Sequence, residues 1–119
     1  MARFECTIPG TYDFDTILNY FHGHIFDKEN FVSYEHGSDH TSGTLRVVVR
    51  IYERYYPIGK DRVSLHLTLA CAGEETMVVC AAVSSSKGVG PLVSHHENEF
   101  LESFITAAKM FEGMTPLNQ

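Results

Sequence analysis

The chain has 119 residues, of which 44% are apolar and 20% are charged, and its formal net charge at pH 7 is −6. This length is typical of one domain around one hydrophobic core, so we expect a single domain over residues 1–119. The negative charge disfavours nucleic acid and anionic membrane surfaces as partners. No stretch approaches the ~20 apolar residues of a membrane span, and the N-terminus lacks a secretory-signal pattern. Three cysteines without C-x-x-C spacing fit reduced thiols, so we expect a cytoplasmic protein.

The first half of the chain changes from a strand period to a helix period and back. Residues 3–8 alternate between polar and apolar side chains, which predicts a strand. Residues 13–26 place apolar side chains on one stripe of an amphipathic helix: Phe14, Ile17, Leu18, Phe21 and Ile25. A short strand at 31–36, a turn-rich loop at 37–43 and a long strand at 44–56 follow.

The second half begins with two further strands. Residues 57–61 contain turn residues and lead into a strand at 63–71. In that strand the odd positions from Val63 to Leu69 are apolar, and the even positions, including His66, are expected to face away from the core. After a turn at 72–75, the strand at 76–84 is apolar on both faces.

A second helix closes the chain. The Ser- and Gly-rich residues 84–91 predict a loop, and a phosphate-binding role for the backbone at 87–90 is the less favoured alternative. Ser94 and Glu97 have the spacing of a capping box at a helix start. Gly113 lies at the expected end of that helix.

These elements follow the order β-α-β-β-β-β-α, which predicts an α+β fold. Short turns between the later strands favour a mostly antiparallel five-stranded sheet. Because each helix has one apolar stripe, we expect a two-layer sandwich with both helices on one face of the sheet. The other face would then have no helical cover.

The strand at 44–56 carries the most distinctive pattern. Its odd positions are apolar and are expected to face the helices: Leu45, Val47, Val49 and Ile51. Its even positions form what we call the Arg/Tyr strip: Arg46, Val48, Arg50, Tyr52, Arg54 and Tyr56. We expect this strip on the uncovered face beside His66. The predicted binding residues are Arg46, Arg50, Tyr52, Arg54, Tyr56 and His66.

Several interpretations of this surface stay open. The leading one is a non-catalytic interaction domain that forms a homodimer, with the strip packed on its symmetry mate or on the acidic helix surface of Glu97, Glu99 and Glu102. The alternative is a protein or enzyme for a small anionic ligand, with the arginines as charge clamps and His66 as the polar group. An ordinary solvated sheet face is a further possibility. A single-stranded RNA platform is the weakest because of the net charge.

Catalytic and metal chemistry have little support. There is no G-x-S-x-G motif, and the cysteines lie within apolar strands that would raise their pKa. His22 and His24, two apart on a helix, point about 200° away from each other and cannot share a metal ion unless the helix has already unwound at Gly23. We therefore expect no cofactor, no metal ion and no catalytic residue.

Two segments carry a resemblance to a known family. Residues 50–56, the turn after them and residues 62–65 resemble a family of small uncharacterised bacterial proteins, as does the helix start at 15–20. The resemblance runs over roughly the first 80 residues. It implies a compact α+β domain and supplies no activity, cofactor or catalytic residue.

Overall fold

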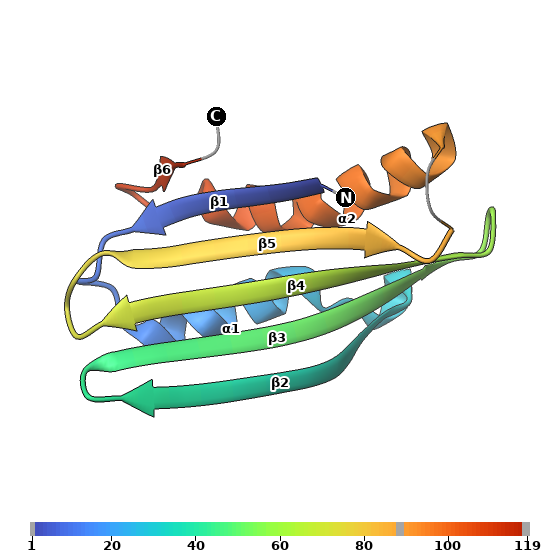
Figure 1. The fold of residues 1–119 in the computed structure, drawn as a ribbon. Helices are drawn as coiled ribbons and strands as arrows, with labels where there is room; N and C mark the ends of the chain where they lie inside the picture. Colours follow the sequence, from blue (N-terminus) through green and yellow to red (C-terminus); the bar gives the residue numbers. More distant parts are fainter. Residues whose placement is uncertain (1, 88–89, 118–119) are drawn as a thin grey trace.

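The structure is a computed structural model that describes residues 2–87 and 90–117 (Figure 1). Six strands, two α-helices and a one-turn 3-10 helix make up these residues. In chain order they are β1 (Ala2–Ile8), α1 (Phe14–Ile25), η1 (Lys28–Asn30), β2 (Val32–Ser42), β3 (Leu45–Tyr56), β4 (Asp61–Ala72), β5 (Met77–Ser85), α2 (Pro91–Ala108) and β6 (Thr115–Pro116).

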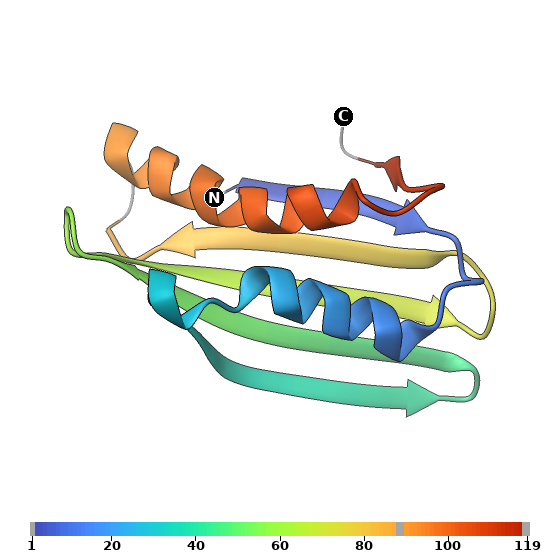
Figure 2. The same ribbon diagram turned by 180° about the vertical axis from the view of Figure 1, so that it is seen from behind.

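All six strands join one antiparallel sheet in the order β2-β3-β4-β5-β1-β6. Both helices lie on the same side of this sheet, α1 over its middle and α2 nearer β1 (Figure 2). The α+β fold with both helices on one face is therefore confirmed. The sheet has six strands where five were predicted, because the short β6 pairs with β1 at Cys6 and Thr7.

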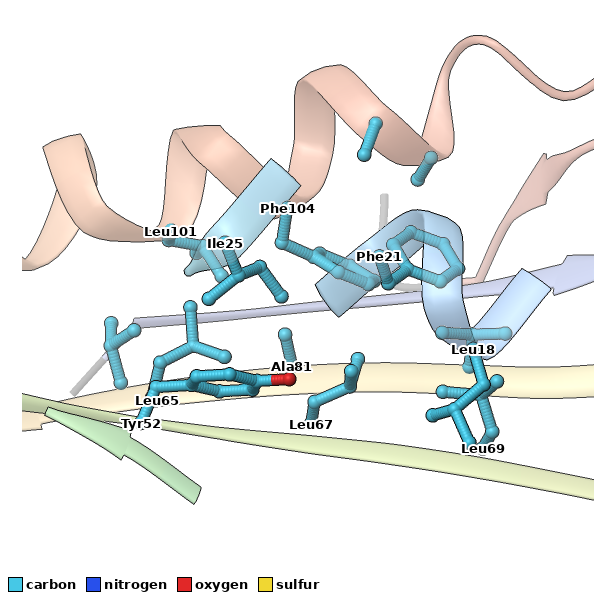
Figure 3. Packing of buried hydrophobic residues seen from close by; sticks show 14 of the residues in the cluster. Leu18, Phe21, Ile25, Tyr52, Leu65, Leu67, Leu69, Ala81, Leu101 and Phe104 are labelled. Carbon is cyan, nitrogen blue, oxygen red and sulfur yellow. The ribbon is translucent and has the colours of Figure 1, made fainter. Parts of the chain in front are cut away.

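The hydrophobic core fills the space between the helices and the sheet (Figure 3). The Asp13 carboxylate accepts a hydrogen bond from the Thr16 amide at 3.0 Å and caps α1. The apolar stripe of α1 then packs on β4, and Phe21 stacks on Phe104 of α2 with ring centroids 5.0 Å apart. The side chains that meet in this layer include Leu18, Phe21, Ile25, Leu65, Leu67, Leu69 and Phe104.

Three predicted boundaries were wrong. The second helix ends at Ala108 and not at Gly113, because the amides of Met110 and Phe111 bond three residues back in turns. Residues 37–42 belong to β2, where a loop was predicted, because β3 supplies hydrogen-bond partners to a polar edge strand as far as the turn at Gly43. Gly43 adopts a positive φ of 60° there.

The second helix begins at Pro91 and not at Ser94. Proline suits the first helical position because that residue has no helical hydrogen bond to lose. The Ser94 amide already donates to the Gly90 carbonyl within the first turn. Gly88 and Val89 of the predicted loop lie outside the described residues.

Candidate functional site

The Arg/Tyr strip faces the helices, which corrects its predicted position on the uncovered face. Tyr52 is fully buried, and Val48 and Tyr56 are 3% and 7% exposed. Burial raises the pKa of Tyr56 to about 12. Leu45, by contrast, is 44% exposed on the opposite face. The more apolar side of β3 is therefore the side without a helical cover.

The register of the β3–β4 hairpin explains this orientation. Tyr56 pairs with Asp61, so residues 57–60 form a four-residue turn. Even-numbered residues of β3 then lie opposite odd-numbered residues of β4, as Tyr52 lies opposite Leu65. Directly opposed residues share a face of the sheet. Because the odd positions of β4 are buried, the even positions of β3 turn to the helices as well.

Arg46 is neutralised by acidic groups of its own chain. Its guanidinium pairs with Asp15 of α1 at 2.9 Å and with Asp39 of β2 at 2.7 Å. The hydrogen bond from Arg46 holds the pKa of Asp39 below its ordinary value. The guanidinium also lies 4.4 Å from the centre of the Phe14 ring. Arg46 of β3 thus links α1 to the edge strand β2.

Arg54 is neutralised in the same way by α2. It pairs with Glu99 at 2.9 Å and lies 4.5 Å from the centre of the Tyr56 ring. Glu99, which was predicted to attract the strip of a second copy, thus binds Arg54 of its own chain. Glu97 is itself buried, with 6% of its surface exposed.

Arg50 differs from its two neighbours. Among residues 2–87 and 90–117, no carboxylate lies within ion-pair distance of its guanidinium. Arg50 lies 5.8 Å from the Tyr34 ring centre and borders a pocket of about 220 Å³. Nearby, His22 and Tyr52 share a 2.7 Å hydrogen bond. Burial, reinforced by the charge of Arg50, lowers the pKa of His22.

His66 lies on the uncovered face as predicted, so the structure separates it from the other five predicted binding residues. Its neighbours in the sheet are Ile51 of β3 and Ala82 of β5, not arginines. An arrangement with His66 as a polar group beside arginine clamps is therefore excluded by the fold.

The uncovered side of the sheet, which we call the open face, is turned to the viewer in Figure 1. The registers place its centre in rows across β3, β4 and β5. The apolar and small side chains of these rows are Leu45, Val47, Val49, Ile51, Thr68, Ala70, Ala72, Val78, Cys80 and Ala82.

The charged side chains of the open face are grouped in pairs around that centre. Glu53 accepts a hydrogen bond from Arg62 at 2.9 Å. Arg3 lies 3.7 Å from Glu5 on β1. The open face thus combines an apolar centre with a margin of locally balanced charge.

A buried polar group that was not predicted joins the sheet to α2. Asp61 and His96 are 1% and 4% exposed, and Asp61 Oδ2 lies 3.1 Å from His96 Nδ1. The Ser85 hydroxyl donates to the other oxygen of Asp61. Burial opposes ionisation of Asp61, but the bonds from Ser85 and His96 outweigh it and lower its pKa.

A signal for this group exists in the sequence. His96 stands four and eight residues before Phe100 and Phe104, so it falls on the apolar stripe of α2. Asp61 likewise continues the odd-numbered buried positions of β4.

The thiols are poor nucleophiles in this fold. Burial, with a smaller contribution from Cys80, raises the pKa of Cys6 to about 11. Burial first, then the nearby Glu5 carboxylate, also raises the pKa of Cys80. Cys80 is nevertheless partly exposed at the centre of the open face, whereas Cys6 and Cys71 are buried.

None of the helices in the described part of the chain is long and apolar enough to cross a membrane.

Comparison with known proteins identifies the family of this chain. No curated protein and no solved structure matches the chain. A model of a family of unknown function, DUF6054, matches residues 1–112 and so extends well beyond the first 80 residues. The chain belongs to the DUF6054 family.

Proposed function

We propose that this protein is a non-catalytic interaction domain of the cytoplasm that pairs with a second copy of itself through the open face. The observation that carries the proposal is the apolar centre of a sheet face without a helical cover. Val78 is 45% exposed and Leu45 is 44% exposed on this face. Contiguous exposed apolar side chains on a folded protein are typical of association surfaces.

The size of the open face suits a dimer. The five strands β1–β5, about 4.8 Å apart and on average about ten residues long at about 3.3 Å per residue, cover roughly 800 Å². An interface of standard size buries about 800 Å² on each partner. A second copy presents a face of the same size and the same apolar centre, so a two-fold arrangement covers both at once.

The charges of the open face also favour a second copy. The pairs Glu53–Arg62 and Arg3–Glu5 are already formed within each chain. Packing two open faces together therefore leaves no charge of these pairs without its counter-charge. A strongly charged partner finds no complementary field here, whereas a copy of the same face has its own charges already paired and needs none.

Light scattering tests the proposal with one substitution on each face of the same strand. The wild-type protein is expected to have twice the chain mass of 13.4 kDa at micromolar concentration. Val49→Lys places a charge at the apolar centre and is expected to give the monomer mass. The matched variant Arg50→Glu changes the covered face and is expected to stay dimeric. A monomeric wild type, or a dimer that Val49→Lys leaves intact, would contradict the proposal.

A second candidate function rests on Arg50. Because Arg46 and Arg54 are held by carboxylates and Arg50 is not, Arg50 is the arginine of the strip best placed to bind an anion. The pocket beside it also contains Ser38 and Tyr34 as hydrogen-bonding groups. The Asp39 carboxylate lines the same pocket, where it is paired with Arg46.

Thermal unfolding with added phosphate or acetate tests this second function. Binding at Arg50 predicts a concentration-dependent rise in melting temperature that Arg50→Gln removes. Arg62→Gln, on the open face, is the matched control and is expected to keep the rise. The same response in wild type and Arg50→Gln would exclude the site.

A further inference from the structure

A separate pocket of about 330 Å³ lies between the β3–β4 turn and the first turns of α2, on the helix side of the sheet. Its walls are apolar at Pro57, Ile58 and Leu92. Ile58 is 79% exposed and Leu92 is 46% exposed, so two large apolar side chains border the opening. Exposed apolar walls around a concave site favour the binding of a small organic molecule.

The turn that forms one wall is closely fitted to α2. Gly59 has a φ of +84°, and a Cβ atom at this position would lie 2.7 Å from Cδ2 of Leu92. Glycine meets both demands because it has no side chain and tolerates positive φ. The turn and α2 are therefore in direct contact beside the pocket.

His96 supplies a fixed polar group in this pocket. Its ring stacks on Tyr56 with centroids 4.0 Å apart, and the Tyr56 hydroxyl donates to its backbone carbonyl at 3.1 Å. Its Nδ1 lies against the Asp61 carboxylate, which only accepts hydrogen bonds when ionised. The Nδ1 atom therefore carries a proton, and in the neutral form of the ring Nε2 is the acceptor.

The Nε2 atom of His96 has no hydrogen-bond partner within residues 2–87 and 90–117, and it is not among the fully buried atoms that lack a partner. It is therefore accessible, although the residue as a whole is 4% exposed. Since His96 lines the pocket, a molecule inside the pocket is well placed to provide a donor for Nε2.

The charges around the pocket specify the donor further. Glu99 lies at the pocket, where it binds Arg54 at 2.9 Å and has His95 at 3.4 Å. Asp61 adds a second carboxylate behind His96. These two negative charges face one arginine, so the site disfavours an anion. The apolar walls at Pro57, Ile58 and Leu92 favour a neutral molecule over a cation, because a charge placed against them loses its hydration.

We propose that this pocket binds a small neutral molecule with an apolar body and one hydroxyl group, of the phenol type, whose O–H donates to Nε2 of His96. The site lies on the helix side of the sheet and is independent of association through the open face.

Matched probes test the site in the full-length protein. Nuclear magnetic resonance titration follows the His96 ring signals during addition of 4-methylphenol, 4-methylanisole or 4-methylbenzoate. The phenol is expected to give saturable shifts. The anisole has no O–H and is expected to bind about tenfold more weakly, the change that one lost hydrogen bond produces. The benzoate is expected not to bind.

Variants separate the pocket from other surfaces. Ile58→Asp changes an exposed wall residue without disturbing the core and is expected to abolish binding of 4-methylphenol. Met110→Asp replaces another apolar side chain, 71% exposed and not among the residues lining the pocket, and is expected to keep it. No saturation with the phenol, equal affinity for phenol and anisole, or equal binding by Ile58→Asp and wild type would each overturn the proposal.

Discussion

The two faces of the same sheet differ in how their polar and apolar side chains are used. On the covered face, polar groups are placed individually: Asp61 binds Ser85 and His96, and Tyr52 binds His22. On the open face, β3 presents an almost uninterrupted apolar row with no helix over it. A solvated face of an antiparallel sheet is ordinarily polar. This inversion along β3 is the observation on which the proposed self-association through the open face rests.

The largest difference in stability between the two faces is expected when one carboxylate is removed from each face. Asp61→Ala leaves Ser85 and His96 without their buried acceptor and is expected to lower the free energy of unfolding by about 3 kcal/mol. Glu53→Ala, on the neighbouring strand, breaks only an exposed pair with Arg62 and is expected to cost less than about 1 kcal/mol. Urea unfolding measures both, and equal losses would remove the distinction between the faces.

A smaller effect is expected from an isosteric change at two adjacent valines. Val48→Thr buries a hydroxyl in the core and is expected to cost about 1–2 kcal/mol. Val49→Thr, on the open face, is expected to cost less than about 0.5 kcal/mol in the dilute monomer and to weaken self-association. The comparison fails if Val49→Thr destabilises the monomer as much as Val48→Thr does.

The smallest effect is expected for His22 on the covered face, which makes the free energy of unfolding depend on pH. Because burial and Arg50 lower the pKa of His22 below its ordinary 6.5, the unfolded chain binds a proton more readily than the folded protein. The free energy of unfolding therefore falls as the pH drops from about 7 through this window. His22→Gln is expected to flatten the dependence between pH 7 and pH 5 in urea unfolding. If the free energy of unfolding of His22→Gln changes with pH as steeply as that of the wild type, His22 does not cause the pH dependence.

Most of the fold could be predicted because β4 and α1 have one apolar face each, so period alone assigns their inward sides. The period gives the wrong orientation for β3, because its more apolar odd positions lie on the open face and its mixed Arg, Val and Tyr positions face the helices. Its orientation depends on the four-residue turn at 57–60, which fixes the register with β4. The misplacement of the Arg/Tyr strip follows from judging β3 without its partner.

The site at His96 was missed for a different reason. A histidine on an apolar helix stripe signals burial, but its partner Asp61 stands 35 residues earlier in the chain. Only the packing of α2 against the β3–β4 turn brings the two together. The extension of β2 was missed because its residues 37–42 are polar and owe their strand conformation to β3.

The native thiol of Cys80 offers the most direct measurement of where two copies meet, because it lies at the centre of the open face. Alkylation of Cys80 is followed by mass spectrometry over a range of protein concentrations in which light scattering reports the change from monomer to dimer. The buried Cys6 and Cys71 provide internal references. If the open faces pack together, labelling of Cys80 slows as the dimer forms. A labelling rate that stays constant while the mass doubles would place the interface elsewhere and contradict the proposed role of the open face.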